Sequence, residues 1–203
     1  AAQTRHVGGS PLVKTAADRG LPPPDQMPWV LITLGTSFNS DPNFFLAAAH
    51  AAARLGCLPI VVLGRHAQPE DETWLRRLPP GPPVRCLIAS DAVLPYLAAA
   101  IHHGGAGTTH ALVTSAVPQI VVPHAADQTY QGAGVVHSGI GYYMPPKNVT
   151  IYSLEAALAT LLPDLSEFRS RARQVQAEFA ALGGAKAAAD AIEHTARTGQ
   201  PSR

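Results

Sequence analysis

The sequence of 203 residues predicts an α/β fold: an open parallel sheet with helices on both faces. Several short segments are apolar throughout, as expected of strands that are covered on both sides. Segments with a helical period fall between most of them. The composition agrees, because 46% of the residues are hydrophobic and 14% are charged, which favours a well-packed core over a disordered chain.

The predicted elements begin after a segment that looks like a linker. Residues 1–28 contain Gly and Pro clusters and no sustained periodicity, so we assign the folded domain to residues 29–203. The predicted strands are short apolar segments that end at a break in the pattern: 29–34, 58–63, 84–89, 97–101 and 119–122. The predicted helices between them are 44–55, 92–98, 108–115 and 129–138.

The C-terminal part is predicted to be helical. One helix is expected to start at Ser153, with Glu155 in its first turn. A second helix, ended by Gly183 and Gly184, has apolar residues three and four positions apart: Leu165, Phe168, Ala172, Val175, Phe179 and Leu182. This stripe is typical of a helix that faces the core, and the alternative is that part of it packs on a further domain.

Charge and cysteine content exclude several classes of function. The formal net charge of +1 gives no electrostatic reason to expect nucleic acid or an anionic membrane surface as a partner. No apolar run approaches the roughly 20 residues that a membrane span needs. Cys57 and Cys86 have no spacing that supports a disulfide or a zinc site. These features predict a cytoplasmic protein.

The most informative segment joins a predicted strand to a predicted helix at residues 99–110. Its small residues at 104–107 would let a ligand come close to the backbone. The helix that follows would offer unpaired N–H groups and a partial positive charge, and Thr108 and Thr109 would add hydroxyls. This pattern predicts a phosphate-binding turn at the carboxyl edge of the sheet, and the alternative is an ordinary tight turn.

Other phosphate and metal motifs do not fit. No Lys-Ser or Lys-Thr pair follows the glycines, and the spacing differs from a dinucleotide fingerprint. His102, His103 and His110 are not expected to bind a metal, since adjacent histidines on a strand point to opposite faces. The sequence has no Asp-x-Asp motif, and residues 70–72 (Glu-Asp-Glu) are predicted to be a solvated loop.

The next strand is followed by Asp127 and Gln128. A carboxylate beside an amide can hold vicinal hydroxyls, although Asp127 alone could equally be the cap of the helix that starts near Thr129. Gly35, Thr36 and Ser37 supply a third loop on the same edge of the sheet. A phosphate-binding turn beside a polyol clamp predicts a nucleotide sugar as the ligand.

The segment from His102 to Gln128 strongly resembles the donor-binding signature of GT-B glycosyltransferases. Its sequence is similar to that of the bacterial enzymes that glycosylate glycopeptide and macrolide natural products, and to that of sterol glucosyltransferases. Residues 30–37 resemble the start of the C-terminal domain of these enzymes, and the resemblance extends over about residues 5–195. It implies one Rossmann-like half of a GT-B fold, with C-terminal helices.

The resemblance implies a role for each matching position. The diphosphate would contact His102, the loop of Gly104, Gly105, Ala106, Gly107 and Thr108, and on the opposite side Thr36 and Ser37. The donor hexose would be held by Asp127 and Gln128, and the base would lie against Leu87 and Ile88. Two departures from the family pattern are Ala116, where glycine is usual, and residues 88–90 (Ile-Ala-Ser), which replace a Trp- or Pro-bearing segment. The second departure leaves the base undecided between UDP and dTDP.

The implied activity is inverting transfer of a hexose to a hydroxyl of a small lipophilic acceptor, a natural product or a sterol, without a cofactor or a metal. Family members carry an N-terminal domain that binds the acceptor and supplies the general base. We therefore assign no catalytic residue to this chain and expect it to be inactive alone. Its partners would be the donor and the missing domain, and any membrane contact would come through the acceptor.

Three alternatives remain at this point. The chain could be one subunit of a split transferase, or a nucleotide-binding module without transferase activity. A nucleotide-sugar epimerase of related fold is the third, although the pairing of Asp127 with Gln128 speaks against it.

Overall fold

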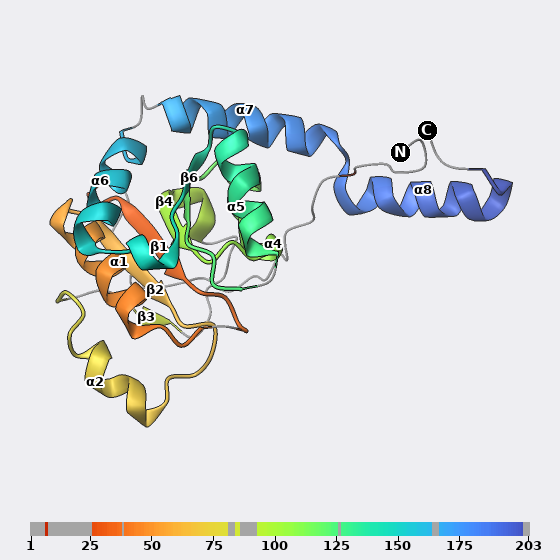
Figure 1. Ribbon diagram of the computed structural model, residues 1–203. Helices are drawn as coiled ribbons and strands as arrows, with labels where there is room; N and C mark the ends of the chain where they lie inside the picture. Colours follow the sequence, from red (N-terminus) through yellow and green to blue (C-terminus); the bar gives the residue numbers. More distant parts are fainter. Residues whose placement is uncertain are drawn as a thin grey trace.

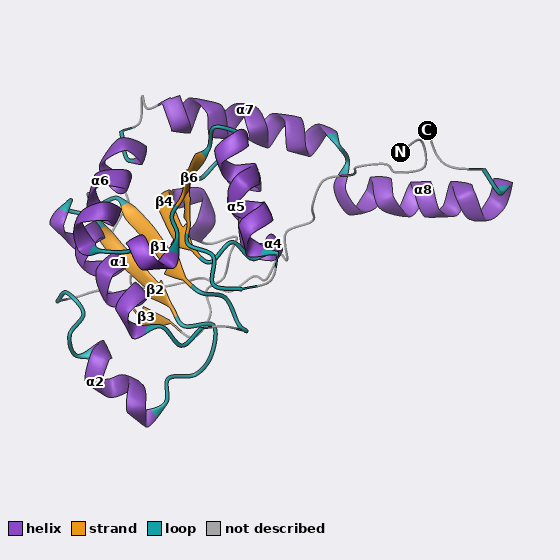
Figure 2. Cartoon of the chain, in the orientation of Figure 1, coloured by secondary structure: helices purple, strands orange, loops and turns teal. Residues whose placement is uncertain are grey.

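The computed structural model describes Val7 and residues 26–200, except 38, 81–83, 86–92, 126 and 164–166. Its centre is a parallel sheet of six strands in the order β3-β2-β1-β4-β5-β6 (Figure 2). The strands are β1 (Trp29–Thr33), β2 (Leu58–Val62), β3 (Val84–Arg85), β4 (Leu97–His102), β5 (Gln119–Val121) and β6 (Gly141–Tyr143). The predicted open parallel sheet is confirmed.

Helices cover both faces of this sheet (Figure 1). One face packs against α1 (Pro42–Arg54), α6 (Ile151–Leu161) and the short α2 (Glu72–Leu75). The other face packs against α4 (Ala106–Thr114), α5 (Gln128–His137) and α7 (Glu167–Ala181). The last helix, α8 (Gly184–Thr198), has no buried residue and extends away from these layers (Figure 1).

The two covered faces explain why the strands are apolar throughout. In β1, Val30 and Ile32 belong to the core under α1 and α6, whereas Trp29 and Leu31 belong to the core on the other face. All five residues of β1 are buried. Because successive side chains of a strand point to opposite faces, a strand covered on both sides favours apolar residues on both, as at the first four positions of β1.

The structure corrects the predicted borders in three places. The helix predicted at 92–98 is wrong from residue 94 on, because Leu94–Tyr96 form a single 3-10 turn and Leu97 already begins β4, whereas Val93 is helical and residue 92 lies outside the described residues. The three-residue strand β6 was not predicted, since its sequence Gly-Tyr-Tyr has no apolar run. The helix expected to start at Ser153 starts at Ile151, and Ser153 instead forms a capping box with Thr150.

Some predictions fall on residues that the structure does not describe. Most of the predicted linker, 1–28, lies outside the described residues, as do Cys86 and all but the first two positions of the predicted strand 84–89. The two described positions of the predicted strand, Val84 and Arg85, form β3. The separate helix α8 was not distinguished in the sequence, where only a helical tail was expected.

The apolar stripe of α7 faces the core, as its spacing indicates. Ala172 is buried against α4 and α5, with Val175 and Phe179 packed beside it, and Phe168 packs on the other core cluster. The guanidinium of Arg169 donates hydrogen bonds to the carbonyl oxygens of Leu97, Ala98 and Ala116. Leu182 is exposed, and Leu165 lies outside the described residues.

Ala116 ends the turn after α4 with a φ of +52°. This left-handed conformation costs a residue with a Cβ roughly 1–2 kcal/mol, and glycine avoids that cost. This positive φ gives a physical reason for the glycine that the family resemblance implies at this position, and alanine adopts the turn here.

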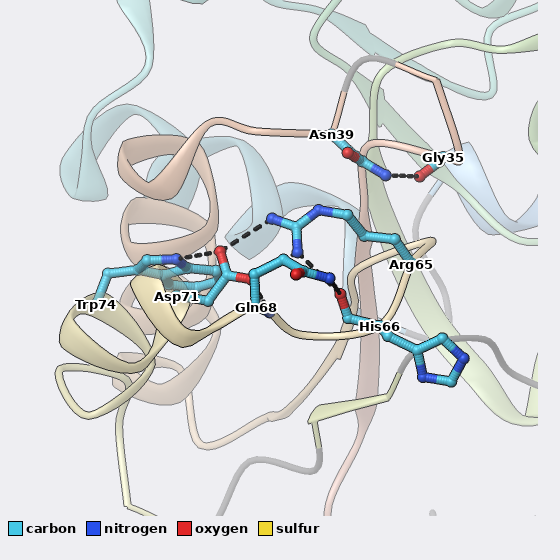
Figure 3. A network of polar contacts seen from close by, with 7 residues as sticks. All are labelled: Gly35, Asn39, Arg65, His66, Gln68, Asp71 and Trp74. Atoms are coloured by element: carbon cyan, nitrogen blue, oxygen red, sulfur yellow. Dashed lines mark hydrogen bonds and ion pairs between the residues drawn. The ribbon is translucent and has the colours of Figure 1, made fainter.

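The segment predicted to be a solvated loop at 70–72 contains a buried carboxylate. Asp71 accepts two hydrogen bonds from the guanidinium of Arg65, at 2.5 and 2.9 Å, one from the backbone N–H of Gln68 at 2.8 Å, and one from the indole of Trp74 at 3.1 Å (Figure 3). Trp74 in turn stacks on Phe45 of α1. The prediction is wrong for Asp71, because these donors fix it against the core at the carboxyl end of β2, whereas Glu70 and Glu72 are exposed.

Asp71 makes the stability of the chain depend on pH in the acid range. The hydrogen bonds from Arg65 hold the pKa of the Asp71 carboxyl far below its ordinary value. An acidic group with a lowered pKa stabilises the fold above its unfolded-state pKa of about 4, and this contribution is lost as the pH falls further. We expect Asp71→Asn to lower the free energy of unfolding by about 2 kcal/mol at pH 7.

Urea unfolding from pH 7 down to the lowest pH at which the chain stays folded would measure this difference, which should shrink below about pH 4. Glu70→Gln, at the exposed neighbouring carboxylate, should leave the stability unchanged. A loss of the same size for both variants would contradict the assignment.

Candidate functional site

The candidate site lies where the strand order reverses, between β1 and β4. The register aligns Thr33, the last residue of β1, with Val62 on one side and His102 on the other, and His102 with Val121. The loops after these strands therefore start at the same level. In open α/β sheets this switch point is where ligands bind.

The imidazole of His103 lies between the loops of β1 and β4. A Cβ placed on Gly35 would lie 2.6 Å from the ring of His103, and a Cβ on Gly105 would also overlap the ring. A Cβ on Gly64, after β2, would overlap the carbonyl of Gly35. Gly35 and Gly64 also have positive φ angles, +72° and +73°. Glycine is required here because the backbones of three loops and one ring share a space that leaves no room for side chains.

The N-terminus of α4 is open to a ligand. Its N-cap residue, Gly105, has no side chain to accept the first N–H groups of the helix. Gly107, in the first turn, is exposed, and a Cβ there would have no atom within 4 Å. An uncapped helix N-terminus bordered by free space is suited to an anion.

His102, at the end of β4, is held inside the protein. Its side chain is fully buried, its Nε2 lies 2.9 Å from Oε1 of Gln119, and its Nδ1 accepts a hydrogen bond from the N–H of Gly104 at 3.1 Å. Both ring nitrogens are therefore engaged inside the protein. Burial lowers the pKa of His102 to about 3, with a further contribution from His103, so the ring is neutral. Because both nitrogens have internal partners, this geometry does not support the predicted contact of the His102 side chain with a diphosphate, and it indicates that the ring supports the turn.

His103, which the sequence did not single out for ligand binding, is the second histidine at this turn. Its Nδ1 is buried and has no hydrogen-bond partner in the described part of the chain. Burial lowers the pKa of His103, and the charge of His124 acts in the same direction. An unpartnered buried polar atom, in a ring that packs against Gly35 and Gly105, is a candidate position for a ligand group. The sequence carried a partial signal, because adjacent histidines at the end of a strand point to opposite faces and therefore have different surroundings. It did not indicate which of the two keeps a ring nitrogen without an internal partner.

The other residues implied at the diphosphate fall into two groups. Thr36 and Ser37 are exposed in the turn after β1, and Thr108 is half-buried in the first turn of α4, so their hydroxyls are accessible. By contrast, Thr109 is buried and its hydroxyl donates to the carbonyl oxygen of Gly105 at 3.0 Å. Asn39 donates to the carbonyl oxygen of Gly35 at 3.3 Å and so holds the loop that carries Thr36 and Ser37 (Figure 3).

Asp127 and Gln128 are adjacent in sequence and differ in their surroundings. Asp127 is exposed and stands at the N-cap position of α5, but its side chain accepts no capping hydrogen bond. The alternative that it serves as a helix cap is thus not supported. The Oε1 atom of Gln128 is used inside the loop, where it accepts from the N–H groups of His124 and Ala125 at 2.7 and 2.9 Å. Only the amide nitrogen of Gln128 is left for a ligand.

The predicted base-binding residues, Leu87 and Ile88, lie outside the described residues, as do Ala89 and Ser90. Among the residues that the structure describes, no three histidine, cysteine or acidic side chains are grouped so that they could bind a metal ion. None of the described helices is long and apolar enough to span a membrane.

The fold defines the class of this protein as an α/β domain with an open parallel sheet, and comparison with known proteins gives its family. The family model of the erythromycin biosynthesis protein CIII-like C-terminal domain matches residues 51–193. NDP-glycosyltransferase YjiC of Bacillus subtilis (strain 168) is 31% identical over 169 residues, which cover 83% of this chain and 42% of the Bacillus protein.

Two solved structures cover 94% of this chain. The glycotransferase of kitacinnamycin is 28% identical with a TM-score of 0.79, and 48% of its chain is covered. CalG4, the calicheamicin glycosyltransferase, is 29% identical with a TM-score of 0.76, and 49% of its chain is covered. The chain thus spans about half the length, or less, of these proteins. It belongs to the family of erythromycin biosynthesis protein CIII-like C-terminal domains, found in GT-B glycosyltransferases of natural-product biosynthesis.

The buried position of His102 predicts a stability change with pH. Between its folded pKa of about 3 and its ordinary value of 6.5, the unfolded chain takes up a proton that the folded chain does not. The free energy of unfolding should therefore fall as the pH drops below 6.5, by about 1.4 kcal/mol per pH unit for this group. His102→Asn should remove that part of the slope, although it also weakens the packing at the turn.

Urea unfolding between pH 4.5 and 7.5 would measure the slope. The matched control is His194→Asn, at an exposed histidine on α8, which should keep the slope of the wild type. If His102→Asn and the wild type had equal slopes, His102 would not be a buried neutral histidine.

Proposed function

We propose that this chain binds a nucleotide diphosphate sugar, with UDP or dTDP as the nucleotide, as the donor half of an inverting hexosyltransferase. The observation that carries the proposal is the open N-terminus of α4 beside the exposed carboxylate of Asp127 at the switch point of the sheet. The first is suited to a diphosphate and the second to sugar hydroxyls. Membership of a glycosyltransferase family supports the same conclusion.

The diphosphate would be held mainly by the backbone. In this proposal it accepts hydrogen bonds from the N–H groups in the first turn of α4 and from the hydroxyls of Thr36, Ser37 and Thr108. The imidazole of His103, between Gly35 and Gly105, would contribute Nδ1 as a further partner. As the bond to the sugar breaks, negative charge grows on the departing diphosphate, and fixed N–H donors stabilise it without reorganising. These N–H and O–H donors present partial positive charges to the diphosphate, so the proposal includes neither a metal nor a cofactor.

The hexose would lie toward α5. The carboxylate of Asp127 accepts hydrogen bonds from its hydroxyls, and the amide nitrogen of Gln128 adds a donor. We propose that the acceptor, a small lipophilic molecule with a hydroxyl, binds to a part of the enzyme outside these 203 residues, in the same chain or in a separate subunit. That part would supply the general base, and the chain alone would transfer no sugar in the cytoplasm or in vitro.

The diphosphate seat can be tested at Gly107. Gly107→Asp places a carboxylate in the first turn of α4, where it favours the helix dipole but repels a diphosphate. We expect the variant to be as stable as the wild type, and its affinity for UDP or dTDP to fall at least about tenfold, which corresponds to 1.4 kcal/mol or more. Isothermal titration calorimetry with each nucleotide would measure the affinity.

Gly107→Ala is the matched control, because a methyl group at this position meets no atom within 4 Å. It should be folded and should bind nucleotide much more tightly than the Asp variant. Equal affinities of the two variants would place the diphosphate elsewhere and remove the basis of the proposal.

The sugar clamp can be tested at Asp127. If the carboxylate holds the hexose, Asp127→Asn should weaken binding of UDP-glucose or a dTDP-hexose by about tenfold and leave binding of the bare nucleotide unchanged. The same titrations on both ligands give this comparison. A nucleotide-binding module without a transferase role would instead show no effect of the substitution on either ligand.

A further inference from the structure

The loop that carries Asp127 is attached to α1 by a histidine that the proposed function does not use. His124 follows Val122 and Pro123 at the end of β5 and is half-buried. Its Nδ1 lies 2.8 Å from the carbonyl oxygen of Val122, and its Nε2 lies 3.2 Å from Oδ2 of Asp41. Because a carbonyl and a carboxylate can only accept, each of these contacts is a hydrogen bond when the ring nitrogen concerned carries the hydrogen.

Asp41 has a second task that does not depend on His124. It is the N-cap residue of α1, and its Oδ1 accepts a hydrogen bond from the N–H of Phe44 at 3.1 Å. The two carboxylate oxygens are thus divided between the helix and the imidazole. The ring of Phe44 lies edge-on to His124, with the centroids 5.6 Å apart, so the imidazole is fixed by packing as well as by hydrogen bonds.

The loop is closed at its other end by Gln128. The Oε1 atom of Gln128 accepts from the N–H groups of His124 and Ala125. His124 is therefore held twice, through its backbone by Gln128 and through its ring by Asp41. Asp127 lies between these two attachment points, and no capping bond holds its own carboxylate.

We infer that the pairing of His124 with Asp41 positions the Asp127 loop for the sugar of the donor, and that His124 does so without touching the donor itself. This inference rests on the proposed function. The diphosphate seat belongs to the loops after β1 and β4 and to α4, whereas the His124 pair fixes the loop between β5 and α5. Loss of the pair should weaken binding of the sugar and leave binding of the nucleotide unchanged.

The variants are chosen to separate positioning from folding. His124→Phe keeps an aromatic ring against Phe44 but removes both hydrogen bonds of the imidazole. Asp41→Ser keeps a side chain that caps α1, but this side chain is too short to reach His124. Asp41→Asn keeps the cap and can donate from its amide nitrogen to a neutral imidazole, so it should behave like the wild type.

The control removes a different ion pair of α1. Glu155→Gln breaks the 2.6 Å pair with Arg54 at the far end of this helix, away from the candidate site. Calorimetric titrations with UDP, dTDP, UDP-glucose and a dTDP-hexose would be made on each variant, together with thermal unfolding.

We expect His124→Phe and Asp41→Ser to weaken binding of the sugar nucleotide by about tenfold and to change the affinity for bare UDP or dTDP by less than about twofold. Asp41→Asn and Glu155→Gln should match the wild type with both ligands. A preserved affinity for the sugar nucleotide in His124→Phe and Asp41→Ser would overturn the inference. So would an equal loss for both ligands, because the pair would then support the fold in general.

The outcome for the proposed function is separate. If the wild type bound none of the four ligands, the proposed function would fail, and this inference with it. If the wild type bound them and Asp127→Asn weakened only the sugar nucleotide while His124→Phe had no effect, the proposed function would stand and this inference would fall.

Discussion

The candidate site depends on how closely the loops after β1, β2 and β4 approach one another. The ring of His103 fills the space between Gly35 and Gly105, and Gly64 lies directly against the carbonyl of Gly35. None of these glycines can gain a side chain without displacing a backbone or the ring. This packing sets the distance between the β1 loop and the N-terminus of α4, and so the width of the space that a diphosphate would enter.

The supports of the site are mostly buried polar groups. His102 joins Gln119 of β5 to the turn after β4, and the amide of Gln119 also reaches the carbonyl oxygen of Thr109 in α4. The Arg65–Asp71 pair supports the segment after β2 in the same way. The donors and acceptors of such buried networks are paired with one another. The turn between β4 and α4 is therefore rigid, and the N–H groups on its outer side are available to a ligand. A rigid set of donors is what stabilisation of a departing diphosphate would require.

The loop between β5 and α5 follows the same division between supporting and binding groups. Gln128 and His124 direct their polar atoms into the loop or toward α1, whereas Asp127 leaves its carboxylate exposed. Two residues that are neighbours in the sequence thus have different tasks. In the proposed enzyme, the sugar would be recognised by a side chain whose position is fixed from two sides.

The sequence by itself determined the class of fold, the carboxyl edge that carries the candidate site, and the family. Hydrophobic periodicity and glycine-rich breaks are local signals that can be read from the sequence. Strands covered on both faces are easy to recognise because they are apolar along most of their length. The tertiary structure alone decided which of two adjacent histidines has both ring nitrogens paired inside the protein, that Asp71 is paired, and that Gln128 turns inward. It also placed the short strand β6, which has no apolar run of its own, and joined His124 to Asp41 across 83 positions of sequence. These features depend on contacts between residues that are far apart in the sequence. Local sequence patterns do not specify such contacts.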